Sequence, residues 1–85
     1  MSKPKTKYID DIEPTLEEMQ KFVGGYIEVL HISKELTMVI DEEGKLNDKP
    51  INQEATNIAH EHEAIFEMDY IAGDVLILSG NARLS

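Results

Sequence analysis

Three kinds of side chain in this sequence could together bind a small ligand. They are an aromatic ring after a pair of glycines, a group of neighbouring amides and a lone arginine: Tyr26, Asn52, Gln53, Asn57 and Arg83. An aromatic ring can stack on a flat base, amides match donor and acceptor pairs, and a guanidinium binds phosphate through two parallel hydrogen bonds. Each kind also has a structural explanation, because the ring could pack in the core, the amides could cap a helix or contact water, and the arginine could lie in an exposed tail.

The sequence contains no motif that favours catalysis or metal binding. His60 and His62 are two positions apart, which places them on different sides of a helix, and the HExxH spacing of a helical zinc site is absent. The acidic stretch DEEGKLND (41–48) lacks the alternating ligands and the closing glutamate of a calcium loop. No serine lies in a nucleophile-elbow pattern, and nothing marks any two carboxylates as converging. We therefore expect no enzyme, no metal and no cofactor.

Composition limits the partners. The 85 residues include 17 acidic and 8 basic ones, and the net charge of −9 repels nucleic-acid phosphates over a Debye length of about 8 Å. We expect no DNA or RNA binding, whereas a basic protein partner is allowed; the acidity could also serve only to keep the protein soluble. The chain has no cysteine and no apolar run of membrane-spanning length, so we expect no disulfide and no membrane contact.

The elements that would position these side chains can be located by pattern. Residues 1–13 show no periodicity and are predicted to form a mobile arm, followed by one domain over 14–85. Thr15 and Glu18 have the spacing of a capping box, Leu16, Met19 and Val23 share one helical face, and the glycine pair can end that helix. A second helix is predicted over about 53–62, with Asn52 as its N-cap.

The strands follow from runs of apolar residues. Residues 26–32 and 36–41 predict an antiparallel hairpin, 65–68 is a possible short strand, and the continuous apolar run at 74–80 predicts a central strand. Gly44 is expected in a turn within the polar loop that follows the hairpin. Together these elements predict an α+β fold, with a small antiparallel sheet of three to four strands and two short helices.

Two of the predicted strands carry large apolar residues at consecutive positions, so both of their faces need cover. Two short helices mask little area, and we therefore expect a homo-oligomer, a dimer or a tetramer, to bury the rest. The alternative is that the loop at 41–51 and the N-terminal arm fold back over the sheet.

Three sequence blocks occur in the order VGGYIEVLHI, MVIDEEGKLNDKPINQEATNIA and IAGDVLILSG. They span about residues 22–81 and resemble a family of small phage and bacterial domains of unknown function, with the pattern VGGxIE, DExGK, PxNxxAT and GDV. Small phage proteins of this type resemble sponges that bind nucleotide second messengers of bacterial antiphage immunity, such as 3′,3′-cyclic GMP-AMP.

The resemblance implies a phage immune-evasion protein that sequesters a cyclic dinucleotide in the host cytoplasm without cleaving it. Tyr26 would then stack on a base, Arg83 and a lysine such as Lys34 or Lys49 would contact the phosphates, and Glu28 or the amides Asn52, Gln53 and Asn57 would contact base edges. Because the chain is so acidic, a dianionic ligand would require a site that gathers cations from several subunits. The alternative function is an acidic inhibitor or nucleic-acid mimic that binds a basic host protein.

Overall fold

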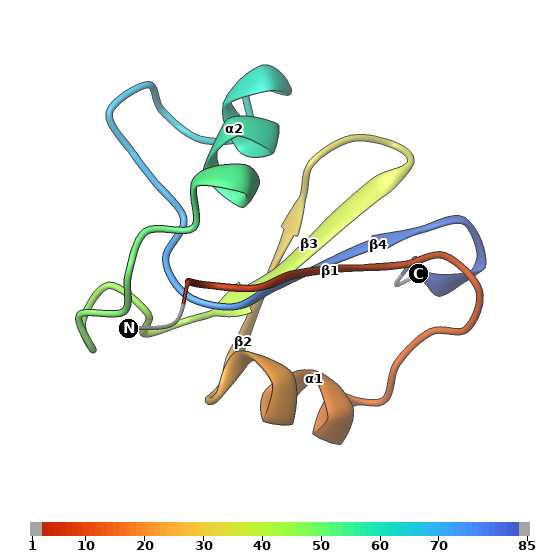
Figure 1. Cartoon of the computed structure of the whole chain (residues 1–85). Helices are drawn as coiled ribbons and strands as arrows, with labels where there is room; N and C mark the ends of the chain where they lie inside the picture. Colours follow the sequence, from red (N-terminus) through yellow and green to blue (C-terminus); the bar gives the residue numbers. More distant parts are fainter. Residues whose placement is uncertain (1–2, 84–85) are drawn as a thin grey trace.

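Four strands form one sheet in the order β1-β4-β3-β2, in a computed structural model that describes residues 3–83 (Figure 1). The helices lie on opposite sides of this sheet, and a short 3₁₀ turn follows the last strand. The elements are β1 (Thr6–Ile9), α1 (Leu16–Val23), β2 (Ile27–His31), β3 (Leu36–Asp41), α2 (Gln53–Glu61), β4 (Val75–Ser79) and η1 (Gly80–Ala82).

The predicted α+β class is confirmed, but the sheet is mixed. Strands β2, β3 and β4 pair antiparallel as expected, whereas β1 pairs parallel to β4 with Thr6 opposite Val75. The prediction of an arm outside the domain is therefore wrong for Thr6–Ile9. This segment is an edge strand of only four residues, too short for its alternation to predict a strand among the polar residues around it.

Helix α1 begins and ends as its sequence predicts. The Thr15 hydroxyl accepts from the Glu18 N–H at 3.1 Å, and the Glu18 carboxylate accepts from the Thr15 N–H at 2.8 Å, which completes the capping box. Gly24 closes the helix in the left-handed conformation (φ 84°). Met19 and Val23 are buried, but Leu16 is 56% exposed, because only part of the predicted apolar face reaches the sheet.

Replacing Thr15 with alanine should lower the free energy of unfolding by about 1 kcal/mol, because the Glu18 N–H loses its only side-chain acceptor. Urea denaturation of both proteins measures the difference. The Thr15→Ser variant keeps a hydroxyl and should stay within about 0.5 kcal/mol of the parent protein. An equal loss in both variants would contradict a capping role.

The consecutive apolar residues of the central strands point alternately to two cores. On one side of the sheet, Val39, Leu76 and Leu78 pack against α1; on the other, Met38 and Ile77 pack against α2. Because successive side chains in a strand point to opposite faces, a sheet with a helix on each side needs apolar residues at every position of its central strands.

The two helices also account for the cover that the consecutive apolar residues of the central strands require. Both faces are covered within one chain, by α1 on one side and by α2 with the 64–72 segment on the other. The pattern therefore does not require a second copy of the chain. Its interpretation as evidence for a dimer or tetramer was wrong. The loop at 41–51 is not the main cover either. Oligomerisation itself stays a prediction.

The segment after α2 differs from its expected form. Residues 65–68 form turns and no strand, and Phe66 and Met68 are 86% and 96% exposed. Ile65 and Ile71 of the same segment do pack on the α2 side of the core. Among the described residues, no helix is long and apolar enough to span a membrane.

Candidate functional site

The six side chains expected to bind a ligand do not form one site in the chain. Tyr26 is 70% exposed beside the end of α1, while Gln53 and Asn57 are exposed on α2, on the other side of the sheet. Glu28 lies on the edge strand β2, and Arg83 follows η1 near the β2–β3 turn. The expected grouping of Tyr26, Glu28 and Arg83 with the amides is therefore not found within one subunit.

Asn52 is a structural residue and not an accessible ligand contact. It is 2% exposed; its Oδ1 accepts from the Ala55 N–H at 2.9 Å, and its Nδ2 donates to the Gly73 carbonyl at 3.1 Å and to Thr6 Oγ1 at 2.9 Å. The same side chain thus caps α2 and joins the start of β1 to the turn before β4. This network explains the asparagine of the PxNxxAT block as a requirement of the fold.

Two of the three cations expected to hold phosphates, Arg83 and Lys49, already have partners. The Arg83 guanidinium donates to the Lys34 carbonyl, and Lys49 forms an ion pair with buried Asp41 and donates to the Val23 carbonyl at 2.7 Å. Gln53 donates to Asn57 Oδ1 at 2.9 Å, so the exposed amides of α2 pair with each other. None of these groups is arranged around a shared cavity.

The Lys49 side chain explains why glycine occupies positions 24 and 73. A Cβ on Gly24 would lie 3.1 Å from Lys49 Nζ, and one on Gly73 would lie 3.0 Å from Lys49 Cδ; both glycines also have positive φ. The lysine side chain thus runs past two turns that only glycine fits, and its ammonium caps the end of α1 at Val23.

The charge on Asp41 is maintained despite burial. Burial alone would raise the pKa of this carboxyl, but the Lys49 ammonium and the Glu43 N–H, which donates to Oδ1 at 2.9 Å, hold the pKa below its ordinary value of 3.8. Oδ2 has no hydrogen bond of good geometry and is compensated by the Lys49 charge. The pair is therefore a fixed internal ion pair that joins α1, β3 and the loop before α2.

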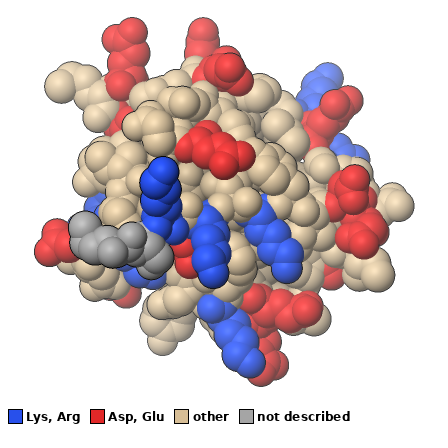
Figure 2. Space-filling view, viewed as in Figure 1, with Lys and Arg blue, Asp and Glu red and all other residues tan. Residues whose placement is uncertain are grey.

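A different set of cations shares one exposed surface. Lys7 on β1 and Lys21 on α1 line the same hollow, and Lys5 lies two residues before Lys7 on the same extended segment. Figure 2 shows lysine side chains gathered in the middle of this face, with carboxylates mostly around it. We call Lys5, Lys7 and Lys21 the lysine face.

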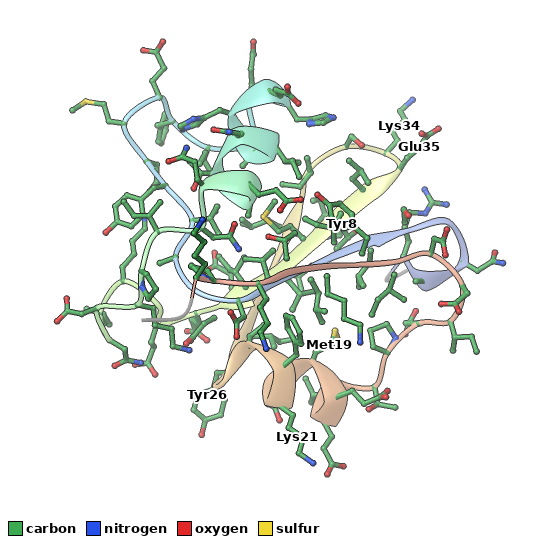
Figure 3. The ribbon with its side chains drawn as sticks, in the orientation of Figure 1. Tyr8, Met19, Lys21, Tyr26, Lys34 and Glu35 are labelled. Atoms are coloured by element: carbon green, nitrogen blue, oxygen red, sulfur yellow. The ribbon has the colours of Figure 1, made fainter. Side chains whose placement is uncertain are left out.

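Two hollows adjoin on this face, and Lys21 lines both. The first, of about 510 Å³, is lined by Tyr26, Gln20 and Asn47 together with Glu17, Asp41 and Glu43. The second, of about 330 Å³, has an apolar wall of Phe22, Ile9, Leu76 and Pro14 and includes Lys7 and Glu18. Figure 3 shows Lys21 and Tyr26 at the same end of the molecule, both pointing outward.

The lysine face was not predicted from the sequence, because residues 1–13 were interpreted as an arm. Lysines at positions 5 and 7 have the alternation of one strand face, which was the available signal. The carboxyl of Glu18 stays ionised beside them, since the Thr15 N–H and hydroxyl, with a smaller effect of Lys7, lower its pKa.

The raised pKa of Tyr8 has a structural explanation. The Tyr8 hydroxyl donates to Glu54, which joins β1 to α2, and this hydrogen bond, followed by burial and the carboxylate charge, raises the pKa of Tyr8 to about 12. Within residues 3–83, no three His, Asp or Glu side chains are placed to hold a metal ion together.

Comparison with known proteins identifies a family. A family model described as Domain of unknown function (DUF3846) matches residues 1–83. No curated protein and no solved structure shows significant similarity to the chain.

Proposed function

The chain belongs to the DUF3846 family of domains of unknown function, and we propose that it binds and sequesters a cyclic dinucleotide without cleaving it. In this proposal it is a phage immune-evasion protein that acts in the cytoplasm of the infected bacterium. The observation that carries the proposal is the position of Lys21 between two hollows, one beside an exposed tyrosine and one with an apolar wall.

A cyclic dinucleotide has two flat bases and two phosphates. The lysine face and its two hollows together offer a contact for each. Tyr26 is exposed for stacking on one base, and the apolar wall at Phe22 suits the other. Lys21 and Lys7 would contact the phosphates. Glu17, Gln20 and Asn47 are available for base edges, because carboxylate and amide oxygens accept from the amino groups of purines.

This location meets a difficulty with the charge only in part, because Glu17, Glu18 and Glu43 line the same two hollows as Lys7 and Lys21. A chain of net charge −9 is a poor host for a dianion, so a site with cations from several subunits was expected. On the lysine face, one chain places three of its eight cationic residues near each other. Sequestration needs only tight stoichiometric binding, and nanomolar affinity corresponds to about −12 kcal/mol.

Isothermal titration with 3′,3′-cyclic GMP-AMP tests the proposal. The double variant with Lys7→Ala and Lys21→Ala should bind at least ~10-fold more weakly than the parent, since each charge-assisted contact is worth about 1.5–3 kcal/mol. Tyr26→Ala should cost about 1–3 kcal/mol of binding free energy through lost stacking.

Lys34→Ala is the matched control, because Lys34 is an exposed lysine on the β2–β3 turn, away from Lys21 in Figure 3. Its affinity should equal that of the parent protein. Absence of binding to a panel of cyclic dinucleotides at about 100 μM would reject the proposal. Binding unaffected by the lysine and tyrosine variants would place the ligand elsewhere.

The second candidate function is an acidic inhibitor of a basic host protein. The net charge of −9 favours it, because complementary charge accelerates association and suppresses wrong partners. Its distinguishing property is a steep loss of partner binding as the salt concentration rises.

A further inference from the structure

Strand β2 presents an open hydrogen-bonding edge. It lies at the end of the sheet, and within the described part of the chain no strand pairs with its outer side. The Glu42 N–H donates to the Tyr26 carbonyl at 2.9 Å and the Ile32 N–H to the Leu36 carbonyl at 3.0 Å. These two bonds fix which residues bond to β3, because an antiparallel ladder uses alternate residues of each strand.

The alternation leaves three residues of β2 with backbone groups directed away from β3. The backbone N–H and C=O groups of residues 26, 28, 30 and 32 point toward β3. Those of Ile27, Val29 and His31 therefore point to the free edge. Such a row of unpaired donors and acceptors is a template for another strand.

An apolar groove runs beside this edge on the α2 side of the sheet. Its volume is about 390 Å³, and it lies between β2, the turn after β3 and the 65–72 segment. The Lys45–Asp69 ion pair lines the groove, and the Lys45 ammonium lies 4.7 Å from the centre of the Tyr70 ring. The apolar side chains of the groove are Leu30, Ile40, Leu46, Ile65 and Ile71.

The groove is acidic where it meets the strand edge. Glu28 and Glu42 line it and are exposed, and they have no ion-pair partner among the described side chains, whereas Asp69 is neutralised by Lys45. Leu46 is 80% exposed at the same groove. An apolar floor with uncompensated carboxylates on its rim is complementary to a segment that carries both apolar and cationic side chains.

We propose that the β2 edge binds an extended, basic segment of another protein by strand addition. The partner strand would pair with the backbone of Ile27, Val29 and His31, and its alternate side chains would enter the groove beside Glu28 and Glu42. A second copy of this chain fits less well, because each copy carries a net charge of −9 and the same acidic groove.

This inference does not depend on nucleotide binding, and it gives the basic-partner function a definite surface. The lysine face includes β1 and α1, whereas the groove lies at the opposite edge strand and on the opposite face of the sheet. The hollow at Tyr26 adjoins the start of β2, but of the residues that line it only Asp41 also lines the groove. A failure of one proposal therefore leaves the other standing.

The test uses an end-blocked octapeptide in which lysine and valine alternate. Fluorescence polarisation measures its binding, and amide hydrogen exchange shows which residues it protects. The peptide should slow exchange at Ile27, Val29 and His31 at least ~10-fold, while Glu28 and Leu30 are already protected by β3. Glu28→Lys should weaken binding at least ~10-fold. The matched control Glu35→Lys makes the same charge change on the exposed β2–β3 turn and should bind the peptide as the parent does.

Two further measurements separate strand addition from simple charge attraction. Val29→Pro removes an outward N–H without removing a bond to β3 and should abolish binding. If that variant fails to fold, a peptide N-methylated at alternate residues replaces it, and this peptide should not bind. Binding without slowed exchange, or binding of the N-methylated peptide, contradicts strand addition. Lack of binding at about 1 mM, or slowed exchange on concentrating the protein alone, rejects the basic segment as occupant.

Discussion

Replacing Asn52 with alanine should lower the free energy of unfolding by about 3–5 kcal/mol. The substitution removes the N-cap of α2, worth about 1 kcal/mol, and leaves the buried Gly73 carbonyl without its amide donor, at about 1–3 kcal/mol. It also removes the part-buried hydrogen bond to the Thr6 hydroxyl, worth about 0.5–1.5 kcal/mol. A domain of this size has only about 5–10 kcal/mol of stability, so a large part of it would be lost.

Urea denaturation followed by circular dichroism measures this effect. Asn57→Ala is the control, because it removes an exposed amide from the same helix and should change stability by no more than about 0.5 kcal/mol. A loss of less than about 1 kcal/mol in Asn52→Ala would show that the buried network is not what joins β1, α2 and the turn before β4.

Replacing Lys49 with methionine should cost about 3 kcal/mol. Methionine fills a similar volume but leaves the Asp41 carboxylate buried without its cation, and breaking a buried ion pair from one side typically costs about 3–5 kcal/mol. The lower end applies because the Lys49 side chain is 26% exposed. Lys45→Met breaks the more exposed pair with Asp69 and should cost less than about 1 kcal/mol.

The pH dependence gives the Lys49 variant a second readout. In the parent protein the pKa of Asp41 is lowered on folding, so this carboxyl stabilises the fold above its ordinary pKa of 3.8, and that contribution is lost as the pH falls through the lower, folded value. Without Lys49, burial should raise the pKa of Asp41, and the acid-unfolding midpoint should move to higher pH. An unchanged acid midpoint in Lys49→Met would contradict the assigned ion pair.

Local signals in the sequence predicted much of the fold, and non-local ones predicted little. The caps Thr15, Asn52 and Gly24 act within a few residues of the helix ends that they define, and each was found where predicted. Strand β1 was missed because its partner is distant: Lys5 bonds to Asp74, 69 positions along the chain, and nothing in four residues indicates that pairing.

The candidate site was predicted less well than the fold. Asn52 was predicted both as a helix cap and as a ligand contact, because the two roles use the same residue type; the cap is confirmed, and the positions of Gly73 and Thr6 show that its donors are occupied. Lys49 was interpreted as a free cation, yet it pairs with Asp41 through contacts that no sequence spacing reveals. The lysine face depends on bringing β1 beside α1, which followed from the missed strand.

The pairing of β1 with β4 has a consequence for folding during translation. Within residues 3–83, the first strand has a single sheet partner, the last strand, so β1 cannot be sequestered until nearly the whole domain has left the ribosome. Such long-range pairing slows folding relative to local hairpins. A nascent chain stalled before residue 75 should therefore hold at most the β2–β3 hairpin and fraying helices, and acquire protease resistance only after β4 emerges.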